Sequence, residues 1–389
     1  MADVADQEHR ALRVALVLAT STGGVGRHVR ALSKGLAEAG HHVAVLGPAA
    51  TDSKFGFAAD ESVSFRPVEI ASGFRPLPDL RAAVRLRRLT RRADVVHAHG
   101  LRAAAVTAAA MLRNGFGRGR FRRPARPVLV VTLHNALLGN GFRHRVLRLL
   151  MYRLTRAADA VLVVSGDLDS ELAALGVAAD RALIAAILEP PSRDAASVRS
   201  ELGIDARAPL VVAIGRLHPQ KGFDVLVEAS SLMQAFVPGL SVVVAGEGPE
   251  RLALERSIEV AGSGVRLLGD RDDVSDLVHA ADVVAMPSRW EGWPLAAAEV
   301  LGAGRPLVAT RVGGLPELVG DAGLLVEPED SGDLADALVR VLTDPQLAAD
   351  LAARARLRAA QLPDDVDVVR QILLCYQRVL GSPLRDGVR

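Results

Sequence analysis

The stretch VVAMPSRWEGWPLAAAEVLGAGRPLVAT, residues 283–310, places two short apolar runs on either side of a small-residue segment. The runs at 283–286 and 307–309 have the length and composition of buried strands. Pro294 suits the first position of a helix because its ring fixes φ. We expect this helix to run to about Leu301 and to stop near the glycines that follow. A strand, a helix and a strand in succession predict a parallel α/β unit.

The same alternation extends over the whole chain. Further strands are predicted at 14–19, 42–46, 95–98, 128–133, 160–164, 210–214, 241–245 and 265–268. Apolar strands separated by helical patterns are typical of doubly wound parallel sheets, and so many strands exceed one comfortable core. The prolines in LEPPSRDAAS, 188–197, interrupt the pattern. We therefore expect two α/β domains of similar size, with ligands in the cleft between them, beyond the carboxyl ends of the strands.

The bulk composition favours a soluble intracellular protein. The 389 residues are 50% hydrophobic and 24% charged, so real cores can form. No apolar run reaches the roughly 18 residues that a membrane-spanning helix needs. The single cysteine, Cys375, excludes an internal disulfide framework.

The net charge of +2 hides an asymmetry between the two halves. Residues 1–190 hold 27 Lys and Arg against 16 Asp and Glu, and residues 191–389 hold 20 against 29. A basic half could face anionic lipid headgroups, nucleic acid or a phosphorylated acceptor. Solvated surfaces without such a partner explain the asymmetry equally well.

Two glycine-rich or basic loops are candidate phosphate sites. In TSTGGVGRHVRALSKGL, 20–36, Gly23, Gly24 and Gly26 let the backbone approach a ligand at a helix start. The spacing is not that of the dinucleotide fingerprint, and a plain strand-to-helix turn fits equally well. In AIGRLHPQKGFDVLVEA, 213–229, Arg216 and Lys221 follow a strand and would suit a diphosphate. The alternative is a pair of solvated surface charges, although Lys221 is one of only three lysines against 44 arginines.

Two glutamates flank the start of the helix in the opening stretch. Glu291 precedes it and can accept hydrogen bonds from a polyol, while Glu299 can accept from a vicinal diol such as a ribose. Between them, the first amides of the helix, those of Leu295 and Ala296, lack intrahelical acceptors and can bind phosphate. The alternative is a helix with an exposed glutamate and alanines that serve packing alone.

Taken together, these motifs resemble those of the retaining family 4 glycosyltransferases, which have the GT-B fold. The resemblance rests on GRLHPQKG (215–222), EGWPLAAAE (291–299), GAGRPLVATRVGGLPELV (302–319), the Gly-Gly loop and VVTLHN (130–135). It implies two Rossmann-like doubly wound parallel-sheet domains facing across a deep cleft. Residues 1–188 would form the acceptor side and 189–363 the nucleotide-sugar donor side. A C-terminal helix, about 364–389, would pack back on the first domain.

The resemblance also implies roles for residues of the donor side. Arg216 and Lys221 would bind the donor diphosphate, and Glu299 the ribose. Glu291 would contact the transferred sugar. The remaining implied donor contacts are the turn of Gly292 and Trp293, the amides of Leu295 and Ala296, and Arg271 near the base.

On the acceptor side, Gly23 and Gly24 would lie near the diphosphate, and His134 near the anomeric centre. His134 and Glu291 are thus the implied catalytic residues. His99, in HAHG (97–100), is an acceptor-side candidate, although a histidine at a strand end is more often structural.

Some features depart from the family pattern or bear on metals. ILEPPSRD replaces the Asn-Gly common after the interdomain crossover, and Trp293 stands where a smaller aromatic residue or a Gly-flanked Phe is common. The Asp-x-Asp pairs at 167/169 and 365/367 lie where a helix N-cap belongs and near the C-terminus, respectively. We therefore expect no cofactor and no metal ion, with cations and a helix start neutralising the leaving diphosphate.

The expected reaction is the transfer of a hexose from a UDP- or GDP-sugar, with retention, to a hydroxyl of a small-molecule, glycan or lipid-linked acceptor. Alternatives are a non-catalytic nucleotide-sugar-binding protein and a GT-B nucleotide-sugar epimerase. Nucleic-acid binding is disfavoured by the low aromatic content.

Basic helical patterns at 80–92 and 143–159 could rest on an anionic membrane. The expected location is therefore cytoplasmic, with a peripheral position at the inner face of the plasma membrane as one possibility.

Overall fold

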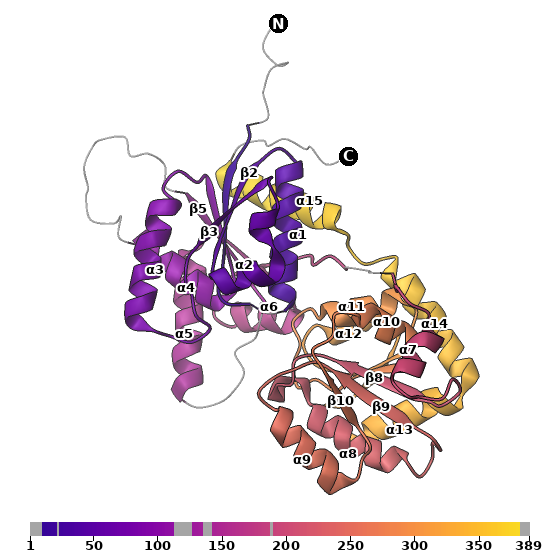
Figure 1. Ribbon diagram of the computed structural model, residues 1–389. Helices are drawn as coiled ribbons and strands as arrows, with labels where there is room; N and C mark the ends of the chain where they lie inside the picture. Colours follow the sequence, from indigo (N-terminus) through magenta and orange to yellow (C-terminus); the bar gives the residue numbers. More distant parts are fainter. Residues whose placement is uncertain (1–9, 22, 113–126, 135–141, 187–189, 382–389) are drawn as a thin grey trace, which may run out of the picture. The chain divides into compact units, whose positions relative to one another are not determined.

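The computed structural model describes residues 10–381 except 22, 113–126, 135–141 and 187–189 (Figure 1). The chain divides into two compact units. Unit 1 comprises Met1–Ala185 and Pro363–Arg389, and unit 2 comprises Ala186–Leu362. The expected boundary at 188 and the end of the expected C-terminal segment, 382–389, lie outside the described residues. No helix among the described residues is long and apolar enough to cross a membrane.

Unit 1 contains a parallel seven-stranded sheet in the order β3-β2-β1-β4-β5-β6-β7. Its strands are β1 (Arg13–Leu18), β2 (His42–Gly47), β3 (Val63–Pro67), β4 (Val95–His99), β5 (Val128–Leu133), β6 (Ala160–Val163) and β7 (Asp180–Arg181). Five of them match predicted strands. β3 and β7 were not predicted, because an exposed edge strand and a two-residue strand lack a continuous apolar run.

The helices of unit 1 are α1 (Gly24–Glu38), α2 (Ala49–Phe55), η1 (Phe57–Ala59), α3 (Pro76–Leu89), α4 (Leu101–Leu112), α5 (Phe142–Ala157), α6 (Gly166–Ala173) and α15 (Asp365–Leu380). Helix α3 packs on α4 and α4 on α5, while α1 packs on α2 and α15. The last contact is close: a Cβ atom at Gly35 would lie 2.5 Å from Val369 Cγ2. Gln371 fastens α15 to the sheet edge by hydrogen bonds with Leu183 N and Arg181 O.

Unit 2 contains a parallel six-stranded sheet in the order β10-β9-β8-β11-β12-β13. Its strands are β8 (Leu210–Ile214), β9 (Ser241–Ala245), β10 (Arg266–Gly269), β11 (Val283–Met286), β12 (Leu307–Thr310) and β13 (Leu324–Val326). The three-residue edge strand β13 was not predicted, because it is too short to be recognised by pattern. The other five match predicted strands to within a residue.

The helices of unit 2 are α7 (Ala195–Glu201), η2 (Pro219–Lys221), α8 (Phe223–Met233), α9 (Arg251–Ala261), α10 (Val274–Ala280), α11 (Leu295–Gly302), α12 (Leu315–Val319), α13 (Ser331–Thr343) and α14 (Pro345–Ala359). Successive residues of a strand point to opposite faces. Val212 accordingly joins a core with α7, α10, α11 and α12, while Val211 and Ala213 join one with α8, α9 and α13. Both faces of the sheet are therefore covered, as predicted.

Two local predictions were wrong. Pro294 is not the first residue of its helix: it occupies the N-cap of α11, which begins at Leu295. Asp167 is not the N-cap of a helix: Ser165 occupies that position, and Asp167 lies in the first turn of α6, where it contacts the Ser165 hydroxyl. Asp367, of the second Asp-x-Asp pair, forms a capping box with Asp364 at the start of α15.

Candidate active site

Glycines bring together the loops that follow β8, β9 and β11 in unit 2. A Cβ atom at Gly246 would lie 1.9 Å from the carbonyl oxygen of Gly215, and one at Gly222 would lie 2.0 Å from that of Pro287. Gly222 also has a φ of +63°, in the left-handed region that glycine adopts most readily. These backbone contacts place η2, and with it Lys221, beside the loop after β11.

Lys221 and Glu291 form an ion pair within this loop cluster. Lys221 Nζ lies 2.5 Å from Glu291 Oε1, and the same oxygen accepts a hydrogen bond of 2.7 Å from Ser288 Oγ. Glu291 is only 6% exposed. A buried carboxylate needs such partners, because an unpaired charge away from water is costly. Two predicted site residues, separated by 70 positions in sequence, are thus in direct contact.

A second glycine loop holds the backbone of Glu291. Gly314 N donates to Glu291 O at 2.9 Å. A Cβ atom at Gly313, where φ is +52°, would lie 1.7 Å from the same oxygen. Gln220 Nε2 also donates to Trp290 O at 2.9 Å. The VGGLPE stretch (312–317) therefore supports the site, a role that was not predicted from the sequence.

The start of α11 presents backbone amides next to this loop. The first amides that donate within the helix region are those of Ala297 and Ala298, both to Pro294 O. The amides of Leu295 and Ala296 precede them and have no intrahelical acceptor. Its N-cap residue, Pro294, provides no side-chain capping hydrogen bond. The amides keep the predicted arrangement, which suits an anion.

The other predicted donor residues differ in their surroundings. Arg216 is exposed just after β8 and forms no side-chain hydrogen bond with the described residues. Gly292 is buried, whereas Trp293 and Glu299 are half-buried. Trp293 packs against the core that contains α11.

Arg271 lies within a charged cluster at the end of β10. Its guanidinium donates to Asp273 at 2.6 and 2.7 Å and to Glu201 at 3.0 Å. Arg193 contacts the same two carboxylates and Asp276. Burial alone would raise the pKa of Asp276, but hydrogen bonds from Arg193 and Ser192 outweigh it and lower the pKa to about 2. The Arg271 side chain is therefore engaged with protein carboxylates.

In unit 1, Gly23 caps α1 and Gly24 begins it. A Cβ atom at Gly23 would meet none of the described residues within 4 Å, so their packing does not require glycine there. Gly26 is different, because its Cβ atom would lie 2.1 Å from the ring of Phe55. Packing against α2 thus explains Gly26 and leaves Gly23 open to a ligand role.

Four buried histidines gather at the carboxyl ends of β4 and β5. His99 Nδ1 lies 3.2 Å from His134 Nε2. His97 stacks on His99 with ring centroids 4.2 Å apart, and His28 of α1 lies edge-on at 5.5 Å from both His99 and His134. His134 and His99 were predicted from the sequence as site residues, whereas His28 and His97 were not. The HAH spacing, which places two histidines on one face of a strand, was the available signal.

Burial disfavours protonation of the four imidazole rings. Burial lowers the pKa of His28 to about 4, and burial together with His28 lowers that of His97 to about 3. Burial and the neighbouring imidazoles hold the pKa of His99 and His134 well below the usual range. All four rings are therefore neutral near pH 7.

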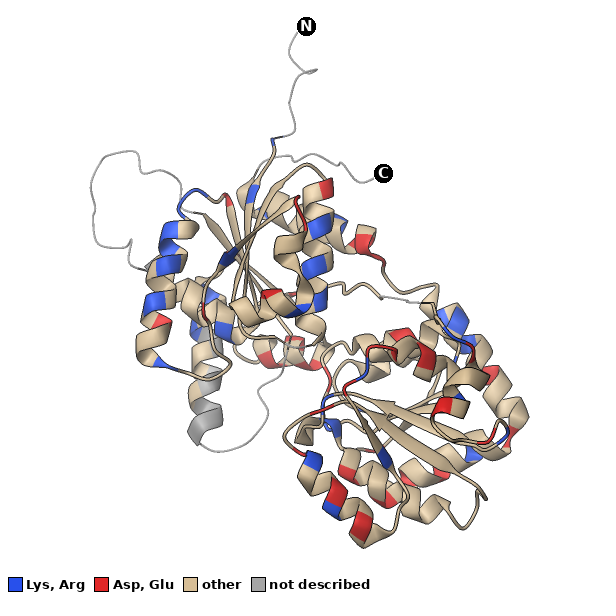
Figure 2. Ribbon diagram, in the orientation of Figure 1, with Lys and Arg blue, Asp and Glu red and all other residues tan. Residues whose placement is uncertain are grey.

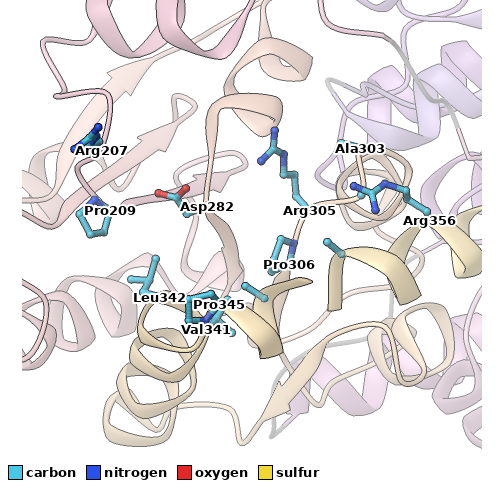
Figure 3. Close-up of a pocket in the computed structure, with 13 residues that line it drawn as sticks. Arg207, Pro209, Asp282, Ala303, Arg305, Pro306, Val341, Leu342, Pro345 and Arg356 are labelled. Atoms are coloured by element: carbon cyan, nitrogen blue, oxygen red, sulfur yellow. The ribbon is translucent and has the colours of Figure 1, made fainter. Parts of the chain in front are cut away.

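Unit 2 also contains two hollows. One of them is a pocket of about 480 Å³. Its lining includes Pro209, Asp282 and Pro306, which immediately precede β8, β11 and β12 (Figure 3). It therefore lies at the amino-terminal edge of the sheet. The other hollow, of about 330 Å³, lies beside η2 and includes His218 and Arg289. None of the predicted donor residues lines either hollow.

Comparison with known proteins decides the family. The profile described as Glycosyltransferase Family 4 matches residues 22–184, and that described as Glycosyl transferases group 1 matches 208–344. The glycogen synthase of Mycobacterium tuberculosis is 30% identical over 89% of this chain and 88% of its own length. The chain belongs to the family 4 glycosyltransferases.

Other relatives of this glycosyltransferase match a smaller region or share the fold. A D-inositol 3-phosphate glycosyltransferase of Saccharomonospora viridis is 39% identical, but the match spans 52% of this chain and about half, 47%, of that relative. The crystal structure of Anabaena HepE with UDP and glucose superposes with a TM-score of 0.79 over 94% of this chain and 100% of HepE, at 23% identity. The predicted GT-B fold is confirmed.

Proposed function

We propose that this glycosyltransferase transfers a hexose from a UDP- or GDP-sugar, with retention of anomeric configuration and without a metal ion, to an acceptor hydroxyl. The observation that carries the proposal is the junction before α11. There a buried carboxylate, an ammonium group and amides without intrahelical acceptors lie within one loop cluster. Such a set can accept sugar hydroxyls and bind a diphosphate at the same time.

The leaving group is a nucleoside diphosphate, whose departure requires neutralised charge. Lys221 and the exposed Arg216 supply cations, and the amides of Leu295 and Ala296 supply hydrogen bonds and the positive end of a helix dipole. Lys221 is already paired with Glu291, so it bridges the protein carboxylate and the phosphate in the donor complex. In this way the chain's own residues stabilise the leaving group.

The sugar and ribose are assigned to the two glutamates. Glu291 accepts hydrogen bonds from hydroxyls of the transferred sugar, with the turn at Gly292 and Trp293 beside it. Glu299 accepts from the ribose diol. Arg271 lies near the base; because its side chain is engaged with carboxylates, we expect the loop backbone rather than the guanidinium to contact the base.

His134 contacts the transferred sugar near the anomeric carbon, and Gly23 and Gly24 approach the diphosphate. In the proposed reaction the acceptor oxygen attacks the face from which the phosphate leaves, and the departing phosphate oxygen takes the acceptor proton. The bond from the anomeric carbon to phosphate oxygen breaks as the bond to the acceptor oxygen forms. Retention rests on the family resemblance.

The Asp-x-Asp pairs have structural surroundings that support a metal-independent reaction. Asp167 contacts a hydroxyl in the first turn of α6, and Asp367 completes the capping box of α15. Cationic side chains and amides supply the charge neutralisation that a bound cation would otherwise supply.

The acceptor is a small molecule, a glycan or a lipid-linked molecule. The names of the two relatives, a D-inositol 3-phosphate glycosyltransferase and a glycogen synthase, support the first two classes. His99 is kept as an acceptor-side candidate, although its contacts with His97 and His134 also give it a structural role.

A peripheral position on an anionic cytoplasmic membrane is proposed from the surface of α3. Leu77, Leu80 and Val84 recur at helical spacing on one face and are 69%, 54% and 42% exposed. Exposed arginines lie on the same helix, at 81, 85, 87 and 88 (Figure 2). The one acidic residue of α3, Asp79, is neutralised by Arg102 at 2.7 Å. Apolar side chains flanked by exposed arginines suit an anionic lipid surface.

The donor assignment is tested by calorimetric titration with UDP and GDP of the wild type and of Glu299→Ala. We expect Glu299→Ala to weaken binding about tenfold or more, which corresponds to about 1.4 kcal/mol. Glu259→Ala, on the exposed side of α9, is the matched control and should bind normally. Unchanged affinity in Glu299→Ala would remove the ribose assignment.

A further inference from the structure

The histidine cluster of unit 1 determines which ring nitrogen His134 offers. His99 Nδ1 and His134 Nε2 lie 3.2 Å apart, so one proton must lie between them. His134 therefore has only its Nδ1 outside this bond. Which of the two rings donates decides whether Nδ1 of His134 carries a proton or a lone pair.

The surroundings of the other ring nitrogen of His99, Nε2, indicate which ring donates. His99 Nε2 is buried and has no hydrogen-bond partner in the described part of the chain. If His134 donated, the proton of neutral His99 would sit on Nε2 as a buried N–H without an acceptor, which is rare in folded proteins. If His99 Nδ1 donates, Nε2 holds only a lone pair, and an unsatisfied acceptor is more readily tolerated. The second arrangement puts the proton of His134 on Nδ1.

Neighbouring groups hold the two rings in this geometry. His97 stacks on His99 at an interplanar angle of 29°. Its own ring is fixed on both sides, because Nε2 lies 2.7 Å from Thr132 Oγ1 and Nδ1 lies 2.9 Å from Tyr376 OH of α15. His28 lies edge-on to the rings of His99 and His134. Within the described residues, the titratable groups around this pair are these histidines, from α1 and β4, and Tyr376 beyond His97.

We propose that His99 is a positioning residue that fixes His134 as the neutral Nδ1–H tautomer, so that His134 meets the transferred sugar as a hydrogen-bond donor and not as a base. This inference rests on the proposed function only for the identity of the ligand. The donated hydrogen bond, from His134 Nδ1 to a sugar oxygen, moves no proton and needs no co-reactant. Burial and the neighbouring imidazoles, which keep the pKa of both rings low, agree with it.

The tautomer is tested by NMR of the full chain labelled with ¹⁵N in its histidine rings. The chain is dialysed against chelator, and signals are assigned through single-histidine variants. We expect His134 to carry its proton on Nδ1 from pH 6 to 8. A proton on Nε2, or a protonated ring within that range, would overturn the proposal.

Three substitutions of His99 separate positioning from packing. His99→Asn keeps an amide donor near the Nδ1 position and should preserve the His134 tautomer. His99→Ala removes it, and His99→Gln places its amide nearer the Nε2 position. Both should give a mixture of His134 tautomers. Equal His134 spectra in all three variants would contradict the proposal, and if His99→Ala does not fold, the Asn and Gln pair decides.

Kinetics distinguish this inference from the proposed function. With UDP-glucose and GDP-mannose as probes, slow donor hydrolysis by His99→Ala should fall about tenfold in kcat with unchanged KM, and His99→Asn should recover most of it. An equal loss in both variants would contradict positioning. Absence of hydrolysis by the wild type would count against the proposed donors while the NMR result stood.

The same spectra test whether a metal ion occupies the cluster. One ring nitrogen from each of His28, His99 and His134 lies within 4.8 Å of the others. A divalent cation held there would take the nitrogens that the tautomer assignment gives to hydrogen bonds. Ring signals of the chelator-treated protein that shift on addition of equimolar Zn²⁺, with binding lost in His28→Ala, would overturn the proposal.

Discussion

Lys221 Nζ and Glu291 Oε1 lie 2.5 Å apart, which joins the cation of the loop after β8 to the carboxylate of the loop after β11. The side chain of Glu291 is 7% exposed and that of Lys221 22%. A pair so shielded depends on both partners, because removal of one leaves the other charge poorly solvated. The donor contacts proposed for the two residues are therefore coupled and not independent.

Lys221→Ala should weaken UDP or GDP binding at least tenfold, or about 1.4 kcal/mol, and should also destabilise unit 2. The second effect arises because Glu291 keeps its charge without its ammonium partner. Calorimetry and urea unfolding measure the two effects. Lys54→Ala, at an exposed helix end in unit 1, is the control. Glu291→Gln in the Lys221→Ala background should restore stability but not nucleotide affinity, and recovery of both would refute the phosphate role of Lys221.

Gly313→Ala should disrupt the site through the backbone of Glu291. The new Cβ atom would lie 1.7 Å from Glu291 O, in addition to the strain of a φ of +52°. Gly239→Ala is a matched control, because φ there is +72° but nothing lies within 4 Å. The control should lose only about 1–2 kcal/mol, the cost of the left-handed conformation, whereas Gly313→Ala should lose more and also bind nucleotide poorly. Equal losses in urea unfolding would remove the proposed support by the Gly313 loop.

Acid should weaken the fold through the histidine cluster. His28 and His97 have folded pKa values of about 4 and about 3, below the ordinary 6.5. The unfolded chain therefore binds protons first as the pH falls. This stabilisation is complete above pH 6.5 and is lost as the pH falls to about 4 for His28 and to about 3 for His97. Complete loss at His28 alone amounts to about 3 kcal/mol. Urea midpoints at pH 7.5, 6 and 5 should fall steadily.

His28→Gln supplies the comparison for this pH dependence. Carboxylates with a lowered pKa, such as Asp276 at about 2, change the free energy of unfolding mainly below pH 5. Between pH 6.5 and 5 the pH dependence of stability therefore comes mostly from histidines. The variant should show a shallower decline between pH 6.5 and 5 than the wild type. A slope equal to that of the wild type would show that His28 is not buried in its neutral form.

The outward face of α3 should govern membrane binding. Leu77→Ser, Leu80→Ser and Val84→Ser combined should reduce co-sedimentation with vesicles rich in phosphatidylglycerol severalfold at low salt. Leu252→Ser with Val260→Ser changes two residues of α9 that are 71% and 90% exposed, and it should leave binding unchanged. Failure of the wild-type protein to bind anionic vesicles, or equal binding to neutral phosphatidylcholine, would contradict the proposal.

Much of the fold was predictable because a buried strand is recognisable in the sequence as a continuous apolar run. The ten predicted strands exist, whereas β3, β7 and β13 escaped because short or half-exposed edge strands bury too little to require an apolar run. The family resemblance, carried by motifs around Lys221 and Glu299, is confirmed by comparison. The residue roles within those motifs stay predictions.

Contacts between distant segments were not predictable from one sequence. Nothing in the spacing of Lys221 and Glu291 indicates that glycines 222 and 246 let their loops meet. His28 lies within an ordinary amphipathic helix pattern, so its contacts with His99 and His134 depend on how α1 packs on the sheet. Side-chain pairing of this kind follows from tertiary packing, which local periodicity does not encode.

The most direct test of the account is a calorimetric titration of the purified full chain with UDP, GDP and ADP in buffer containing chelator. We predict that UDP or GDP binds selectively without metal, and that Lys221→Ala weakens this binding at least tenfold. Failure of all three nucleotides to bind, or binding that appears only after magnesium or manganese is supplied, would contradict the metal-independent donor site at the start of α11.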